Sequence, residues 1–211
     1  LYSRYTEEVV KHVSNFIKIV HGEENKIKYG DGKDIEFKDT PFSLKKEATP
    51  KFGGNVAVSK ARGAKKIKFY NDLKDHIIDL KKTTSNLIVM GDFNVSPEDI
   101  DIGIGENNAK RWLREGKTSF QPQEREMWNS IKDLGFIDSW RELFPNESSI
   151  YSWFDYRSRM FDQNPKRGLR IDHILLSDNL KKSINNVGID YDARSMEKPS
   201  DHCPVWLELN E

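Results

Sequence analysis

Five polar side chains stand beside or inside apolar segments, where they could bind a cation. Asp92 and Asn94 follow a short apolar run and a glycine. Asp172 interrupts a second apolar segment, and Asp201 with His202 precedes the last one. Buried carboxylates are costly unless they are paired or bind a cation, and oxygen ligands suit Mg²⁺ or Mn²⁺. Together, these residues predict a site for metal-assisted phosphoryl transfer.

Each of these residues also has an ordinary structural interpretation. Residues 91–94 could be a strand followed by an Asx turn, and Asp172 could be a buried, hydrogen-bonded acid. Asp201 and His202 could form a turn with a capping acid and a surface imidazole. An imidazole beside a buried carboxylate would be oriented and would favour its protonated form. The three acids and the histidine together therefore favour a catalytic site over these separate structural interpretations. The other histidines are expected to be structural or surface residues: His12, His21, His76 and His173.

Two local basic patches stand out against a neutral chain. Lys plus Arg and Asp plus Glu both number 34, which excludes a strongly basic polyelectrolyte binder. The patches lie at 110–117 and 157–170, and both mix cations with aromatic residues or tight turns. Such a mixture suits a phosphate backbone and stacked bases, although each patch alone could be an ordinary charged loop.

Hydrophobic periodicity predicts the elements that must position these residues. Helices and strands mix without strict alternation, which favours a layered sandwich in one domain over the 211 residues. The single cysteine excludes an internal disulfide and fits a reducing compartment, and no apolar run is long enough to span a membrane. Helices are expected at 1–20, 66–81 and 122–134 with a C-cap at Gly135, a hairpin at 27–37, and strands at 56–58, 87–90, 152–156, 170–176 and 205–209.

Six short motifs follow one another along the second part of the chain. They are Gly91–Asn94, Asp99–Gly103, Lys110–Arg114, Trp153–Arg157, Gly168–Asp172 and Arg194–His202. With these motifs in this order, the sequence over about residues 65–211 resembles the bacterial exonuclease III family, a branch of the endonuclease/exonuclease/phosphatase superfamily.

The resemblance implies a fold and an activity. The fold would be an α/β four-layer sandwich of two packed, mainly antiparallel sheets flanked by helices. The activity would be hydrolysis of double-stranded DNA 5′ to abasic sites with Mg²⁺ or Mn²⁺, together with 3′-to-5′ exonuclease action at 3′ blocks. The family also implies a monomer that works without a membrane, in the bacterial cytoplasm beside the nucleoid.

The resemblance also implies roles for the site residues. Asp92 would position or deprotonate the attacking water, and Asn94 would help to hold the metal and phosphate. His202 would contact the scissile phosphate, with Asp172 orienting it, and Asp201 would be a carboxylate on the metal side. The implied metal-site residues are therefore Asp92, Asn94, Asp201 and His202.

Other matched positions would contact the DNA. An apolar slot suits a flipped-out sugar that carries no base. The implied abasic pocket consists of Trp153, Leu169 and Ile171. The implied DNA-binding residues are Lys110, Arg111, Trp112, Arg157 and Arg167.

The front of the chain departs from the family pattern. Three family motifs are not found before residue 65: the early asparagine-rich motif, the motif with the principal metal-ligand glutamate, and the tyrosine motif. The front sheet is therefore expected to be shortened or rebuilt. Glu23, Glu24 or Glu36 could replace the glutamate.

Three alternatives to an active abasic-site nuclease stay open. They are a relative that binds abasic DNA without turnover, a truncated or rearranged sequence whose parent is active, and a phosphodiesterase for inositol phosphates or lipid head groups.

Overall fold

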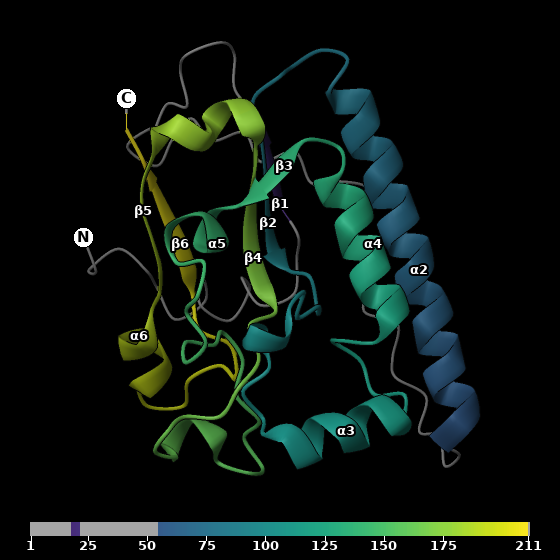
Figure 1. The fold of residues 1–211 in the computed structure, drawn as a ribbon, viewed down its shortest axis with the longest axis vertical. Coiled ribbons are helices and arrows are strands. Elements are labelled where there is room, and N and C mark those ends of the chain that lie inside the picture. Colours follow the sequence, from purple (N-terminus) through teal and green to yellow (C-terminus); the bar gives the residue numbers. More distant parts are fainter. Residues whose placement is uncertain (1–17, 22–54, 211) are drawn as a thin grey trace.

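Two antiparallel sheets form the centre of the molecule (Figure 1). The computed structural model describes residues 18–21 and 55–210, with side chains from residue 65 onward. The larger sheet has the strand order β1-β2-β4-β3, and β5 pairs with β6 in the smaller sheet. The strands are β1 (Lys18–His21), β2 (Leu87–Asp92), β3 (Phe136–Asp138), β4 (Asp172–Ser177), β5 (Ile184–Ile189) and β6 (Val205–Leu209).

Two long helices cover one face of the larger sheet. In α2, Tyr70, Leu73 and Ile77 recur at helical spacing and are buried against the sheet. Trp128 and Ile131 of α4 complete this core cluster. The α-helices are α2 (Asn55–Leu80), α3 (Glu106–Arg114), α4 (Pro122–Lys132), α5 (Ser139–Leu143) and α6 (Tyr191–Ser195); the 3₁₀ helices are η2 (Asp99–Asp101), η3 (Met160–Asp162) and η4 (Asp178–Ser183).

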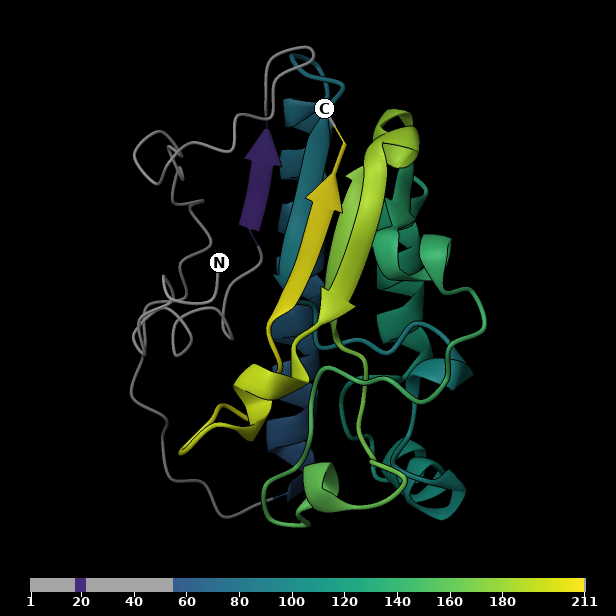
Figure 2. The ribbon, with the colours of Figure 1, turned by 90° about the vertical axis from the view of Figure 1, so that its left-hand side faces the viewer.

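The smaller sheet packs on the opposite face of the larger one (Figure 2). Ile88 and Leu176 of the larger sheet share a cluster with Val205 and Leu207 of β6. The described residues thus build an α/β sandwich with three of the four expected layers: the helices α2 and α4, the larger sheet and the smaller sheet.

Loops and short helices gather at one end of the sandwich, beyond the end of β2 and the start of β4 (Figure 1). There α3, η3 and α6 pack around a second core cluster that includes Phe120, Phe154 and Phe161. This packing gives the loops at the strand ends a rigid support.

Several sequence-based expectations are confirmed. The helix expected at 66–81 lies within α2, and the apolar runs at 87–90 and 205–209 are strands. The helix expected at 122–134 is α4, but it ends at Lys132 with Asp133 as its C-cap in place of Gly135. Gly135 follows two residues later with a φ of +87°, and its N–H donates to the Lys132 carbonyl at 2.9 Å. None of the helices in the described part of the chain is long and apolar enough to cross a bilayer.

Other expectations are wrong. Residues 56–58 belong to α2, because three β-branched or small residues cannot stop a helix that propagates cooperatively. Residues 152–156 form a loop with a bridge only at Trp153, and the segment expected at 170–176 becomes a strand from Asp172 onward. Residues 18–21 pair with β2 as a strand and are not helical. The rest of the helix expected at 1–20 and the hairpin at 27–37 lie outside the described residues.

Candidate active site

Asp92 and Asp172 face each other across neighbouring strands. Strand β2 ends at Asp92 and β4 begins at Asp172, and the antiparallel register pairs the two residues directly. Directly opposed residues project their side chains from the same face of a sheet. Burial raises the pKa of the Asp92 carboxyl to about 7, and the charge of Asp172 adds to this effect. A proton or a cation is therefore favoured between these carboxylates.

His202 completes this group from the loop before β6. Its Nδ1 atom lies 3.0 and 2.9 Å from the two carboxylate oxygens of Asp172, and its Nε2 atom lies 4.0 Å from Oδ2 of Asp92. Burial alone would lower the pKa of the imidazole. The hydrogen bond and charge of Asp172, with the charges of Asp92 and Asp201, outweigh burial and raise that pKa to about 9. The ring is therefore held as an imidazolium with Nε2 on the Asp92 side.

Asn94 is fixed on Asp92 by a tight turn. Its backbone N–H donates to Oδ1 of Asp92 at 2.8 Å, and its side-chain Nδ2 donates to Oδ2 at 2.7 Å. Asn94 has a φ of +53°, a left-handed conformation that asparagine tolerates better than most residues. The Asx turn considered as an alternative is thus present, and it brings the carboxamide to the carboxylate.

Asp201 is held slightly apart from this group. Its carboxylate accepts a hydrogen bond from the indole Nε1 of Trp153 at 3.0 Å, and its backbone carbonyl accepts one from the Phe154 N–H at 2.9 Å. These contacts fasten the loop that carries His202 to the loop at 152–156. The role of Asp201 as a carboxylate on the metal side stays a prediction.

The donor set suits a hard cation. Asp92, Asp172 and His202 each offer a ligand atom, and these atoms lie within 4.8 Å of one another; they are the metal-binding group found among the described residues. A divalent ion would offset both the burial and the charge of Asp172, which together raise the pKa of Asp92. The group includes Asp172, which the resemblance assigns only to orienting His202. Glu23, Glu24 and Glu36 lie outside the described residues.

The predicted DNA-binding residues of α3 differ in exposure. Lys110 and Arg111 are exposed, and Lys110 pairs with Glu106 at 2.5 Å. Trp112 is partly buried and stacks on Phe120, with ring centroids 6.0 Å apart and planes within 3°. Helix α3 therefore presents its cations outward while Trp112 anchors it.

The other two predicted DNA-binding residues lie in the loop at 155–168. Arg157 is exposed in a turn. Arg167 is partly buried, and its guanidinium donates to the carbonyl of Ile104, just before α3. Arg167 therefore also ties this loop to the segment that leads into α3.

The three residues assigned to the abasic pocket lie together. Trp153 and Leu169 exchange two backbone hydrogen bonds, at 2.9 and 3.0 Å. Leu169 and Ile171 are 1% and 3% exposed in the second core cluster, whereas Trp153 packs against that cluster and is only partly buried. The pocket role of these residues stays a prediction.

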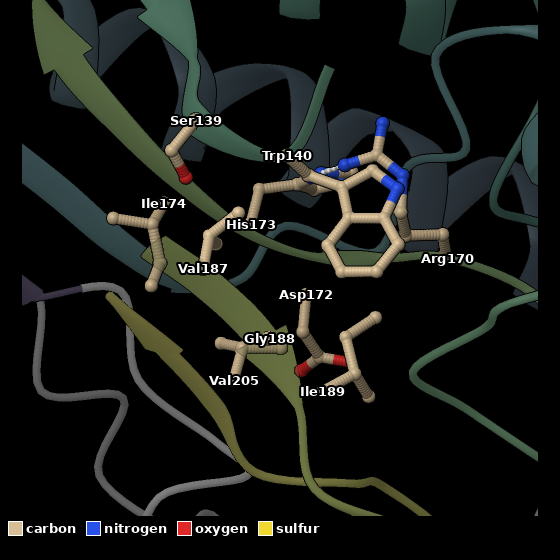
Figure 3. Close-up of a pocket in the computed structure, with 10 residues that line it drawn as sticks. All are labelled: Ser139, Trp140, Arg170, Asp172, His173, Ile174, Val187, Gly188, Ile189 and Val205. Carbon is tan, nitrogen blue, oxygen red and sulfur yellow. Dashed lines mark hydrogen bonds between the residues drawn. The ribbon is translucent and has the colours of Figure 1, made fainter. Parts of the chain in front are cut away.

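A cavity lies beside Asp172, between β4, α5 and the smaller sheet (Figure 3). Trp140, Val187 and the Asp172 carboxylate are among the residues that line it. The lining includes none of the three residues assigned to the abasic pocket. This cavity is therefore distinct from the position expected for a flipped sugar.

Sequence reasoning missed a buried ionic network that supports the site. The guanidinium of Arg170 contacts Asp101 at 2.6 Å, Asp138 at 2.8 Å and Nδ1 of His173 at 2.8 Å. Since arginine can only donate, His173 accepts at Nδ1 and donates from Nε2 to the Val95 carbonyl at 2.7 Å. The structural role expected for His173 is therefore confirmed. An arginine beside a strand-forming run was the one available signal for this network.

These features place the chain in a known family. The sequence matches the Endonuclease/Exonuclease/phosphatase family over residues 9–202, and the chain belongs to that family. The match begins within the segment in which the sequence analysis finds no family motif.

Particular relatives are similar over about two thirds of the chain. Exodeoxyribonuclease III of Haemophilus influenzae is 52% identical over 144 residues, which cover 68% of this chain and 53% of that protein. A 3′ phosphatase, NExo, from Neisseria, solved with a product DNA hairpin, is 34% identical with a TM-score of 0.61, covering 68% of this chain and 52% of that one. An AP endonuclease from Archaeoglobus fulgidus is 27% identical with a TM-score of 0.58, covering 72% and 55%. The chain thus spans about half the length of the relatives it matches.

Proposed function

We propose that this protein is a divalent-metal-dependent DNA phosphodiesterase of base-excision repair, folded as one domain and active as a monomer on double-stranded DNA. It would cleave 5′ to abasic sites and act as a 3′-to-5′ exonuclease at 3′ blocks. The observation that carries the proposal is the arrangement of Asp92, Asp172 and His202 at paired strand ends. The family match and the names of the relatives support it.

The geometry suggests how these residues would share the work. Of the four residues that the resemblance assigns to the metal, Asp92, Asn94 and Asp201 would hold Mg²⁺ or Mn²⁺, whose charge would stabilise the negative charge that develops on the phosphate. His202 is held as an imidazolium, which has no free lone pair to offer to a cation. Asp92 would position or deprotonate the attacking water, because its carboxylate lies beside Asn94 and faces Nε2 of His202. The imidazolium of His202 would donate from Nε2 to a phosphate oxygen while Asp172 accepts at Nδ1. The raised pKa favours this phosphate contact over metal ligation by His202.

The recognition surface would flank this centre. Exposed Lys110, Arg111 and Arg157 would contact backbone phosphates, and Arg167 and Trp112 would position the loops that carry them. Trp153, with Leu169 and Ile171 behind it, would form the wall against which a sugar without a base packs.

Cleavage of a defined abasic duplex tests this function. The substrate is an oligonucleotide duplex with one tetrahydrofuran abasic analogue, incubated with Mg²⁺, with Mn²⁺ or with EDTA. We expect incision 5′ to the analogue that EDTA abolishes and that Asp92→Asn lowers by about 100-fold or more. Asp75→Asn, an exposed acid on α2, is the matched control and should retain wild-type activity. Incision that is equal in Asp92→Asn and wild type would overturn the proposed mechanism.

A second function is favoured by the departure of the front segment from the family motifs. In that case the protein would bind abasic duplex through Arg111 and Arg167 without cutting it. Gel-shift binding that survives EDTA, with no incision above a protein-free control, would support this function over the first. Chelator-sensitive turnover would exclude it.

A further inference from the structure

Lys66 of α2 reaches from the helix layer to the loop that carries the candidate active site. Its Nζ atom donates to the Asn94 carbonyl at 2.7 Å, to Oε1 of Glu124 at 2.6 Å and to Oγ1 of Thr118 at 3.1 Å. The Lys66 side chain is only 15% exposed. An ammonium has three protons to donate, and here each has an acceptor. One side chain therefore connects α2, the start of α4 and the loop after β2.

The main partner of Lys66 is itself rigid. Oε2 of Glu124 accepts hydrogen bonds from the backbone N–H groups of Ser119 and Gln121, both at 2.8 Å, and Oε1 accepts one from the Thr118 hydroxyl at 2.7 Å. Burial lowers the pKa of Lys66, and the charge of Glu124 opposes this change. The Lys66–Glu124 ion pair is largely buried, so it can fix the positions of the groups around it, whereas a solvent-exposed pair contributes little.

The contacts of Lys66 stabilise the backbone conformation of Asn94. Asparagine adopts the left-handed backbone conformation more readily than most residues, but the conformation still costs free energy that surrounding contacts can offset. On one side the two N–H donors of Asn94 are directed at Asp92, and on the other its carbonyl is held by Lys66. Tyr70, one turn further along α2, holds the adjacent Phe93 carbonyl through its hydroxyl at 2.7 Å. Helix α2 therefore donates hydrogen bonds to two consecutive backbone carbonyls of this loop, those of Phe93 and Asn94.

We propose that Lys66 is a positioning residue that holds the backbone of Asn94 in the conformation from which both of its N–H groups reach Asp92. Lys66 would act through Asn94 and would not touch the substrate. Its effect on catalysis rests on the proposed function, whereas its effect on the Asn94 backbone does not.

The decisive experiment measures the loop directly in metal-free protein. Lys66→Met keeps the length of the side chain but removes the charge and the donors. We expect the backbone N–H of Asn94 to exchange with solvent at least about tenfold faster by NMR, and its amide resonance to move. Lys68→Met is the matched control, because Lys68 lies on the same helix and, among the described residues, its ion pair is with the partly exposed Asp72. Unchanged exchange and resonances of Asn94 in Lys66→Met would overturn the proposal.

A second variant guards against misfolding. Lys66→Met leaves Glu124 buried without a cation, whereas the double variant Lys66→Met/Glu124→Gln buries no charge and keeps an acceptor for the start of α4. We expect the double variant to unfold cooperatively and still to show the fast-exchanging Asn94 amide. Protection of Asn94 equal to the wild type in this folded double variant would also overturn the proposal.

Kinetics on the abasic duplex separate positioning from general destabilisation. In Lys66→Met, we expect kcat to fall about 10- to 100-fold while KM changes less than about twofold, because the reacting groups are misplaced and the DNA-binding surface is intact. Equal loss in kcat and in duplex binding would argue against positioning. If the wild type itself does not cut DNA, the proposed function fails, and the NMR result alone decides the role of Lys66.

Discussion

The imidazole of His202 donates to both carboxylate oxygens of Asp172, which lie 3.0 and 2.9 Å from its Nδ1 atom. This contact joins the loop before β6 to the first residue of β4. It determines the charge of His202, because the hydrogen bond and the negative charge of Asp172 outweigh the cost of burying an imidazolium.

Asp172→Asn should therefore lower the pKa of His202. In metal-free protein, we expect the wild-type imidazole to titrate at about 9, and the variant to titrate near the ordinary value of 6.5 or below it. NMR titration of the ring measures both. Because the folded pKa is the higher one, His202 stabilises the fold fully below pH 6.5, and this contribution disappears as the pH rises through 9. An unchanged midpoint in Asp172→Asn would contradict this account.

Asp92→Asn should stabilise the metal-free protein while it lowers cleavage by about 100-fold or more. The pKa of Asp92 rises from 3.8 to about 7 on folding, so protonation favours the folded state below pH 3.8, and this advantage is lost as the pH rises to 7. Replacing the carboxyl by a neutral amide should increase the free energy of unfolding by about 2–4 kcal/mol at pH 8. Urea unfolding with EDTA tests this, with Asp75→Asn as the control. The difference in free energy of unfolding between Asp92→Asn and the wild type should grow between pH 4 and 7, and a constant difference would contradict the prediction.

Arg170→Met should be strongly destabilising. Arg170 is 1% exposed, and its loss leaves buried Asp101 and Asp138 without their shared cation. We expect the free energy of unfolding to fall by about 3–5 kcal/mol, measured by urea denaturation at pH 7. Arg159→Met is the comparison, since its pair with Asp162 is exposed and should contribute less than about 1 kcal/mol. Similar losses in the two variants would show that burial of the network contributes little.

Arg111→Ala should reduce the salt dependence of DNA binding. An exposed cation that neutralises one phosphate releases about one counterion, so the slope of log affinity against log salt should become shallower by about 1. Fluorescence anisotropy with an abasic duplex in EDTA measures this slope. Lys82→Ala, two residues after the end of α2, should leave the slope unchanged, because that end of α2 lies at the opposite end of the molecule from α3 (Figure 1). A slope in Arg111→Ala identical to that of the wild type would show that Arg111 of α3 does not neutralise a DNA phosphate.

The segments with the clearest local patterns were predictable. The apolar runs at 87–90 and 205–209 and the helical period at 66–81 each carry their own burial pattern, so neighbouring residues suffice to assign them. The apolar runs at 87–90, 170–176 and 205–209 located Asp92, Asp172 and His202 in or near strands. Residues 56–58 and 152–156 were misassigned because a few β-branched or aromatic residues do not outweigh an adjoining helix or a loop core.

By itself, the sequence determined which side chains could do chemistry and the family to which their motifs point. Only the tertiary structure decided that Asp92 pairs with Asp172, because register depends on how two strands distant in sequence meet. It also decided that Lys66 and Arg170 support the site, since neither residue has a sequence neighbour that reveals its partner. Local patterns encode burial and secondary structure, whereas the charge states of Asp92 and His202 arise from groups that folding brings together.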